Sequence, residues 1–333
     1  MPSSAPPTRI IECPRELRVE ALRTLHDALP LDQRSVLAQV LDQFDPADEA
    51  AWAGLLIAAS NRAPSKSAAL DGVIWVQRAP GNTAVIWAAP EDGDVSAALL
   101  RAAAAFVDAH GISLAQMVVG DRDGYSEAEI ERGGFPRFAG LLYLFAEVSQ
   151  LPDANDGVAA PASEVQQRGD LQFVARAGDE PQRLGVLLEQ TYLGTLDCPG
   201  LDGIRPIVEV LEGYRNQGRH SPEDWYFVQK DGGDVGVLIL AAHPGFGNWE
   251  LVYMGVIPEA RGKKCGAEII RFALDVAARH GAERLVLAVD EGNAPALRAY
   301  ERAGFVVWDR RLVYARLRAP AQLSANVELP KPP

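Results

Sequence analysis

The sequence predicts an α/β fold built from two tandem units. Three observations lead to this expectation: an internal repeat, the same order of strands and helices in both halves, and a stretch without periodicity between them. The length of 333 residues agrees with it, because a chain of this length usually forms roughly two domains.

The repeat is visible without gaps. Residues 98–135 fall on residues 268–305 when they are shifted forward by 170 positions, so that ERGGF lies over ERAGF. Each half then reads strand, strand, helix, strand, helix, Gly-Phe, strand, with amphipathic helices expected at 96–110 and 267–280. Such a repeat indicates two copies of one α/β unit.

The segment between the two copies has a different composition. Residues 149–170 lose all periodicity and are rich in Pro, Ala, Asp and Ser, which is typical of a linker. We therefore expect a first unit over 1–148, a second over 171–318 and a tail over 319–333.

Composition narrows the class of function. The net charge of −13 argues against nucleic acid as a partner, since a phosphate backbone favours a basic surface. No apolar run is long enough for a bilayer, and the N-terminus lacks the apolar region of a signal peptide. Cys13, Cys198 and Cys265 have no spacing typical of metal sites or disulfides, so we expect a cytoplasmic protein without a metal.

A basic turn in the second half follows a strand. The stretch NWELVYMGVIP alternates, which predicts that Glu250, Val252, Met254 and Val256 share one face. The turn RGKKCG comes next, and then a helix begins. A helix start offers unpaired N–H groups and a positive dipole end, so the turn predicts a site for a diphosphate. The alternative is a solvated basic turn.

A second helix completes this region. In EGNAPALRAYERAGF, Asn293 is expected to cap a helix that has Pro295 in its first turn. Tyr300 lies on the helical face of Ala296 and Leu297. Two roles remain open for this tyrosine: packing in the core, or catalysis.

Together, GVIPEARGKKCGA and NAPALRAYERAGF resemble the two signatures of the GCN5-related N-acetyltransferase (GNAT) superfamily. These signatures are an Arg/Gln-x-x-Gly-x-Gly/Ala loop and an Asn-x-x-Ala-x-x-x-Tyr-x-x-x-Gly-Phe helix. The resemblance covers 171–318 well and the first half in outline, and the plan is similar to that of two-domain members such as mycothiol synthase. It implies a mixed central sheet flanked by helices in each unit.

The resemblance also implies an activity: acetyl-CoA-dependent transfer of an acetyl group to a primary amine by direct attack, in the second unit and without a metal. The acceptor would be a small molecule or a peptide. The residues expected at coenzyme A are Met254, Gly255, Val256, Arg261, Gly262, Lys263, Lys264, Cys265, Gly266, Ala267, Asn293 and Tyr300. Among them the pantetheine arm would pair with the strand, and the basic turn would hold the diphosphate.

The resemblance gives catalytic roles to two residues. Tyr300 falls on the general-acid position, and Glu250 lies where a related branch carries a general base that acts through water. A structural carboxylate is the alternative for Glu250. The expected acceptor contacts are Tyr192, Thr195 and Asp197, unless their segment is an ordinary surface loop. No role follows from the sequence for His243 or Cys198.

Lys264 departs from the family signature, because it stands where the loop has its first glycine. If this position requires a positive φ, the lysine costs roughly 1 kcal/mol.

The first half lacks the same chemistry. The 170-residue offset places Glu91, Asp92 and Asp94 on the basic turn and Ile130 on Tyr300. Carboxylates repel a diphosphate and isoleucine has no proton to donate, so the first half is expected to be degenerate and to wall the acceptor cleft. Three readings stay open beside the acetyltransferase: a coenzyme A-binding sensor or scaffold, another acyl donor, and a thiol-bearing pseudo-sugar as acceptor.

Overall fold

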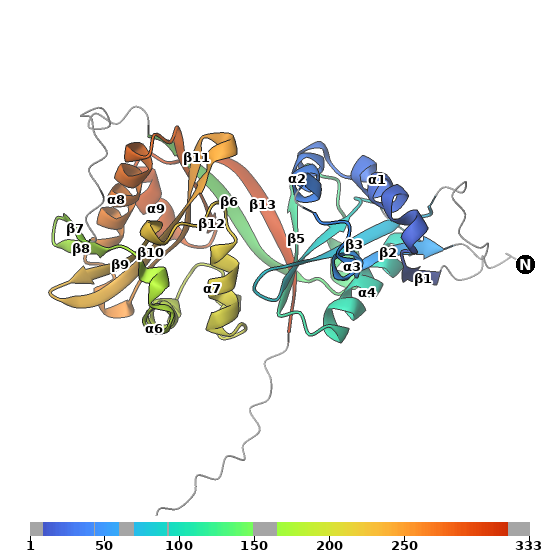
Figure 1. Cartoon of the computed structure of the whole chain (residues 1–333), viewed down its shortest axis with the longest axis horizontal. Coiled ribbons are helices and arrows are strands. Elements are labelled where there is room, and N and C mark those ends of the chain that lie inside the picture. The colour runs from blue at the N-terminus through green and yellow to red at the C-terminus, as the bar shows by residue number, and fades with distance from the viewer. Residues whose placement is uncertain (1–8, 43, 60–69, 92, 149–164, 319–333) are drawn as a thin grey trace, which may run out of the picture.

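The computed structural model describes residues 9–42, 44–59, 70–91, 93–148 and 165–318 (Figure 1). Residues 149–164 of the expected linker, the tail 319–333 and Asp92 therefore lie outside the described residues. Helices cover a twisted sheet that runs through both halves, so the predicted α/β fold is confirmed.

The sheet contains thirteen described strands in the order β1-β2-β3-β4-β5-β13-β6-β12-β11-β10-β9-β8-β7. The strands β4–β5 and β11–β12 pair in parallel and the other neighbours pair antiparallel, so the sheet is mixed as expected. Their bounds are β1 Arg9–Glu12, β2 Leu55–Ala59, β3 Val73–Ala79, β4 Thr83–Ala88, β5 Leu114–Gly120, β6 Arg137–Glu147, β7 Val165–Arg168, β8 Leu171–Val174, β9 Trp225–Lys230, β10 Gly233–His243, β11 Asn248–Val256, β12 Arg284–Asp290 and β13 Val306–Leu317.

The described α-helices lie on the two faces of this sheet, and four apolar clusters fill the space between. The helices expected from periodicity are found as α4 and α8, each starting two residues earlier and ending one residue earlier than predicted. The helix bounds are α1 Arg18–Ala28, α2 Leu31–Asp42, α3 Glu49–Trp52, α4 Asp94–Ala109, α5 Glu127–Arg132, α6 Pro181–Tyr192, α7 Ile207–Arg215, α8 Cys265–Arg279 and α9 Ala294–Arg302. None of these helices combines the length and apolar composition that crossing a bilayer requires.

The internal repeat is a symmetry of the sheet. Strands β5 and β12 begin and end 170 positions apart, and the strand order reads the same from both directions up to the extra edge strand β7. At the centre β6 and β13 pair antiparallel, with Leu141 opposite Arg311, which are also 170 positions apart. A pseudo-twofold axis therefore passes between these two strands.

The two halves exchange their last strands. Strand β6 belongs to the first half in sequence but lies between β13 and β12, and β13 lies between β5 and β6 (Figure 1). Neither half of the chain has a complete sheet of its own. Residues 165–168, which the sequence placed in the linker, form the edge strand β7 against β8.

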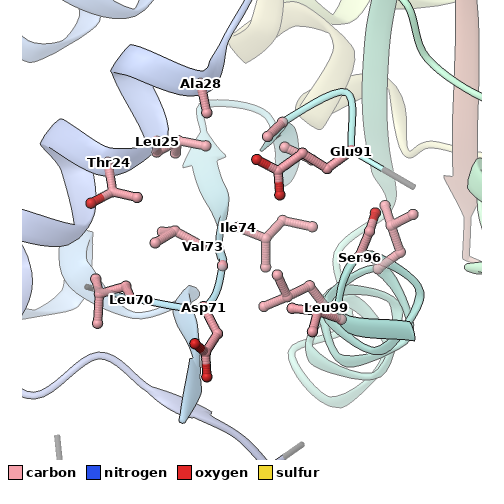
Figure 2. Close-up of a pocket in the computed structure, with 15 residues that line it drawn as sticks. Thr24, Leu25, Ala28, Leu70, Asp71, Val73, Ile74, Glu91, Ser96 and Leu99 are labelled. Carbon is pink, nitrogen blue, oxygen red and sulfur yellow. The ribbon is translucent and has the colours of Figure 1, made fainter. Parts of the chain in front are cut away.

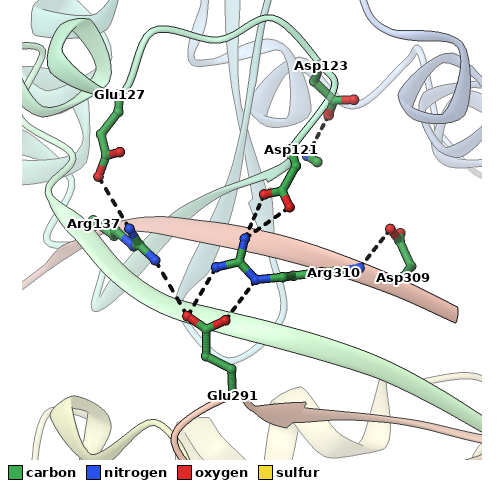
Figure 3. A network of polar contacts seen from close by, with 8 residues as sticks. Asp121, Asp123, Glu127, Arg137, Glu291, Asp309 and Arg310 are labelled. Atoms are coloured by element: carbon green, nitrogen blue, oxygen red, sulfur yellow. Dashed lines mark hydrogen bonds and ion pairs between the residues drawn. The ribbon is translucent and has the colours of Figure 1, made fainter. Parts of the chain in front are cut away.

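A polar network joins the halves beside the axis. Arg310 of β13 donates from Nη1 to Oδ1 of Asp121, which follows β5, at 2.8 Å. It also donates from Nε to Oε2 of Glu291, which follows β12, at 2.8 Å (Figure 3). Asp121 and Glu291 are equivalent positions of the repeat, so one guanidinium holds both. Arg137 of β6 lies 3.5 Å from Glu291. The Arg310 guanidinium lowers the pKa of the Glu291 carboxyl.

Candidate active site

Strands β11 and β12 separate within the second half. They pair only as far as Glu250 and Val286, although β11 continues to Val256. The amide of Ile257 donates to Val235, toward β10. Since backbone groups alternate in direction along a strand, the N–H groups of Met254 and Val256 point toward the gap beyond Glu250. This open edge could accept an added amide-bearing chain.

A bulge in β11 corrects one expectation. Val252 has no partner on β10, because Leu251 pairs with Leu240 and Tyr253 with Ile239. An extra residue reverses the in-out alternation of everything after it. Leu251 and Met254 accordingly pack in the cluster under α8, whereas Tyr253 packs in the cluster under α6. Glu250 thus faces the opposite side from Met254 and Val256, and the prediction of one shared face is wrong.

The turn before α8 presents free backbone donors. The amides of residues 262–266 have no hydrogen-bond acceptor among the described residues, whereas the amide of Ala267 donates to Lys264 at 3.1 Å. Lys263 and Lys264 are exposed and form no ion pair within the described part of the chain. Several free amides at the start of a fifteen-residue helix are the kind of donors that bind an anion.

Lys264 adopts φ 65° and ψ 4°, in the left-handed region. This position therefore does require a positive φ, which a glycine adopts without strain and a lysine does not. Gly262, two positions earlier, also has a positive φ of 74°. The side chain of Cys265 points into the core, only 3% exposed, so this residue offers its amide alone.

Arg261 has a different task from the one expected. Its Nε donates to the Val256 carbonyl at 3.0 Å, and its two terminal nitrogens donate to Thr191 at 2.9 Å and Gly194 at 3.1 Å. The guanidinium is thus bound to carbonyls at the ends of α6 and β11. The expectation that this side chain grips a diphosphate does not agree with these contacts.

The α9 helix carries the remaining residues of the second signature. Asn293 caps the helix as predicted, with Oδ1 accepting from Ala296 at 3.3 Å. Tyr300 is 5% exposed in the core, and its hydroxyl forms no hydrogen bond with the described residues. Burial raises the pKa of Tyr300, and the negative charge of Asp197 raises it further.

The expected acceptor loop is held against the end of β12. Asp197 Oδ1 accepts from the amide of Asp290 at 2.8 Å, and Asp290 Oδ2 accepts from the amide of Cys198 at 3.2 Å. Thr195 accepts from the Asp197 amide and so shapes the turn. Although Asp197 remains open to solvent on one side, desolvation by its neighbours raises the pKa of its carboxyl.

Tyr192 belongs to an aromatic group on the same side. Its hydroxyl lies 3.1 Å from that of Tyr214, and its ring meets Tyr253 edge-on at 5.6 Å. The Tyr253 hydroxyl forms a hydrogen bond with the Thr191 hydroxyl at 2.7 Å. The three tyrosines and Asp197 form a partly buried wall that suits an amine with an apolar body.

Sequence reasoning missed the partner of Glu250. Its Oε2 lies 2.7 Å from Nε2 of His243, and both side chains are 27% exposed. The hydrogen bond to Glu250 raises the pKa of His243. The pairing register of the β10–β11 hairpin would have revealed this contact. His243 pairs with Asn248 and is therefore a diagonal neighbour of Glu250.

Two side chains of the first half lie near Glu250 and the expected acceptor loop. Tyr143 of β6 lies close enough to Glu250 for that charge to raise its pKa, after the larger effect of burial. Phe138, also on β6, packs so tightly on Gly200 of the acceptor loop that a Cβ there would lie 2.6 Å from the ring. Two aromatic side chains of the first half thus border the expected acceptor cleft.

Comparison with known proteins identifies the second half. Residues 192–305 match the model of the Acetyltransferase (GNAT) family. This part of the second half is therefore similar to a GNAT domain. The matched segment begins at the acceptor loop and ends at the Gly-Phe of the second signature, so it contains most of the residues described above.

Curated relatives of the chain include mycothiol acetyltransferases. The one from Mycobacterium leprae (strain Br4923) is 30% identical over 166 residues, which are 41% of this chain and 52% of that protein. The chain thus spans about half of this relative, and only 21% of the one from Stackebrandtia nassauensis. The family and these relatives are acetyltransferases.

Solved structures extend the likeness to both halves. A GCN5-related N-acetyltransferase from Sphaerobacter thermophilus has a TM-score of 0.57 at 14% identity, over 95% of this chain and 98% of that chain. A tandem GNAT protein from the clavulanic acid biosynthesis pathway has a TM-score of 0.50 at 15% identity, over 94% of this chain and 99% of that one. The chain therefore has a tandem GNAT fold.

In the first GNAT-like unit a carboxylate of the protein lies at the start of the equivalent helix. The amide of Gly93, at the start of α4, donates to Glu129 Oε1 at 3.0 Å, and Glu129 is only 6% exposed. Ile130, the counterpart of Tyr300, is 2% exposed in the core. A carboxylate of the protein thus lies where the equivalent helix of the second unit has free amides.

A small cavity of about 60 Å³ remains beside α4 (Figure 2). Leu25, Val73 and Leu99 line it with apolar surface, and Asp71 and Glu91 add carboxylates. Neither the volume nor the charge suits a coenzyme with phosphates. Among the residues that the structure describes, no group of three His, Cys, Asp or Glu could hold a metal ion.

Proposed function

We propose that the protein is an acetyl-CoA-dependent N-acetyltransferase that acts on a primary amine of a small molecule, through the second half of the chain. The observation that carries the proposal is the run of free amides at 262–266, which includes the two basic residues Lys263 and Lys264, beside the open edge of β11. Nothing else in the described chain uses these donors.

The fit to coenzyme A follows from the chemistry of these groups. Free amides, the positive end of α8 and two lysines would bind a diphosphate. The N–H groups of Met254 and Val256 would pair with the amides of the pantetheine arm and bring the thioester into the gap. Arg261 serves this site indirectly, since its three hydrogen bonds fix the end of β11 and the end of α6.

The reaction would run in one displacement. The free amine attacks the thioester carbonyl, a C–N bond forms, and the C–S bond breaks to release the thiolate of coenzyme A. The acylated nitrogen loses one proton, which balances the proton that the thiolate takes up. Tyr300 remains protonated throughout the neutral range, because burial raises its pKa. Its hydroxyl, which has no other partner among the described residues, would donate to the departing sulfur. An acetyl-CoA reaction and three free cysteines support a cytoplasmic setting.

Thiol release from acetyl-CoA with a panel of primary amines tests the proposal. We expect amine-dependent turnover and, by calorimetry, one coenzyme A site per chain, because Glu129 fills the equivalent position in the first half. Binding without turnover for every amine would favour a coenzyme A sensor, and turnover only with longer acyl groups would change the donor. Two equal sites per chain would contradict the placement in the second half.

Substitution of Tyr300 separates catalysis from core packing. Tyr300→Phe should lower kcat by about 10- to 10⁴-fold with nearly unchanged affinity for coenzyme A, as expected for a lost proton donor. The matched control is Tyr226→Phe, another tyrosine of the same core, 2% exposed. Equal turnover in the two variants would show that Tyr300 packs in the core and donates no proton.

A further inference from the structure

The pair of His243 and Glu250 has a defined hydrogen-bond direction. An ionised carboxylate only accepts, so the 2.7 Å contact requires a proton on Nε2 of His243. In the neutral imidazole Nδ1 then keeps its lone pair. Nδ1 has no hydrogen-bond partner among the described residues, and the side chain is 27% exposed.

The pair lies at the closed end of the gap between β11 and β12. Glu250 belongs to the last residue pair before the two strands separate. It is on the face of β11 opposite to Met254 and Val256, as the bulge at Val252 dictates. Glu250 therefore lies on the same face of β11 as Tyr253, which is the side of the three tyrosines.

Each neighbouring element presents few charges to the imidazole. On its own hairpin, Glu250 is the charged group that acts on His243. From β6, Tyr143 faces Glu250, and Arg311 and Asp309 of β13 act on Tyr143.

The remaining side of the ring is covered by the chain after α7. Gly218 packs so closely that a Cβ there would lie 3.0 Å from Nε2 and Cε1 of His243. The charge of the adjacent Arg219 acts on Asp224. Close packing on the Nε2 side leaves Nδ1 as the nitrogen that a substrate could reach.

We propose that His243 and Glu250 act as a carboxylate–imidazole dyad, in which Nδ1 of His243 receives the proton of the acceptor ammonium and Glu250 fixes the tautomer of the ring. The proposal rests on the proposed function, because the amine is the acceptor of that reaction. The N–H bond of the ammonium breaks and its electron pair becomes the nucleophile. The proton forms a bond to Nδ1, and the imidazolium beside Glu250 releases it to water after transfer.

The pH dependence of kcat/KM separates this dyad from a carboxylate that acts alone. Activity requires neutral His243, so it should fall as pH drops through the pKa of His243, which Glu250 raises. His243→Gln should remove this acidic limb and lower kcat by about 10²- to 10⁴-fold, with recovery at high pH as free amine is supplied by solution. Glu250→Gln should shift the limb to lower pH rather than abolish it, because the charge that raises the pKa is gone. Loss of the limb in Glu250→Gln, or near-wild-type turnover with an intact limb in His243→Gln, overturns the dyad.

Two further measurements test the dyad without an activity assay: the tautomer of the His243 ring and its pKa. ¹⁵N NMR of the ring nitrogens should show the Nε2–H tautomer, and the pKa of His243 should fall in Glu250→Gln; a proton on Nδ1 overturns the proposal. The control is His26→Gln, which removes another imidazole–carboxylate pair, that of His26 and Asp27 at 3.0 Å in the first half, and should leave the profile unchanged. If the wild-type protein acetylates no amine, the proposed function fails together with the dyad; if it does and His243→Gln matches it, the dyad fails alone.

Discussion

At the scale of single residues, Lys264 shows how a binding loop accepts local strain. An L-residue in the left-handed region costs roughly 1–2 kcal/mol, and here a lysine holds φ 65° where the family signature has glycine. The amides of this turn have no acceptor among the described residues. The strain is confined to the turn that presents these donors.

Replacement of this lysine should stabilise the fold. We expect Lys264→Gly to raise the free energy of unfolding by about 0.5–1 kcal/mol, since relief of strain exceeds the added backbone entropy of glycine. Lys263→Gly is the control, because Lys263 is not among the residues with positive φ, and it should lose stability instead. Chemical denaturation measures both.

The same variant tests the charge of the turn. Affinity for coenzyme A in Lys264→Gly should stay equal or improve. An affinity loss of more than about tenfold, or 1.4 kcal/mol, would show that the ammonium group contacts a phosphate directly. Destabilisation of both glycine variants by the same amount would contradict the strain argument.

At the scale of elements, Arg261 connects the two loops of the site. It donates to carbonyls at the end of α6, where a helix leaves carbonyl groups unsatisfied and favours positive charge. Through Nε it also holds the end of β11. The coenzyme turn and the acceptor loop are therefore fixed to each other by one side chain.

Loss of the Arg261 hydrogen bonds should lower the stability of the fold but leave the salt dependence of coenzyme A binding unchanged. We expect Arg261→Ala to lower the free energy of unfolding by about 1–2 kcal/mol and to raise KM for the amine. The salt dependence of coenzyme A binding should stay as in the wild type, whereas Lys263→Gln should reduce it.

The conservative variant Arg261→Lys provides the contrast. A lysine keeps the charge but cannot reach three carbonyls, so it should resemble Arg261→Ala in stability. If it restores wild-type binding, and if Arg261→Ala weakens the salt dependence, Arg261 contacts the phosphates after all.

Sequence patterns predicted some of these elements better than others. The 3.6-residue period located α4 and α8 within two residues, because their buried faces continue over many turns. The bulge at Val252 was not predictable, since one extra residue in a strand has no distinctive type. The signature located Arg261 and Tyr300 but not the atoms they contact, and contacts such as His243 with Glu250 depend on the register of a hairpin.

At the scale of the whole molecule, the exchanged strands make the two halves one folding unit. Every neighbour of β6 belongs to the second half, and β13 completes the sheet of the first half. The offset of 170 residues predicted two similar units, but it could not predict which strand joins which sheet. Both arrangements have the same alternation and the same buried faces. The Arg310 network reinforces the joint on one side of the axis.

Cutting the chain between Val148 and Val165 tests this unity. We expect a protein cleaved there at an engineered protease site to keep both fragments associated in size-exclusion chromatography and to unfold in one transition. Each fragment produced alone should be unfolded or aggregated, because β6 or β13 would lack its partners. Two stable, monomeric fragments would contradict the prediction.

Strand exchange also has a consequence for the timing of synthesis. The first half emerges from the ribosome with β6 complete at Glu147, but its partner β13 is finished only at Leu317. At about 5–20 residues per second, the edges of β5 and β6 wait roughly 10–30 s for a neighbour. During this interval two nascent chains on one polysome could pair their exposed edges, so we expect translation speed to influence yield. Protease sensitivity of β6 in stalled nascent chains, lost once β13 has emerged, would measure the length of this delay.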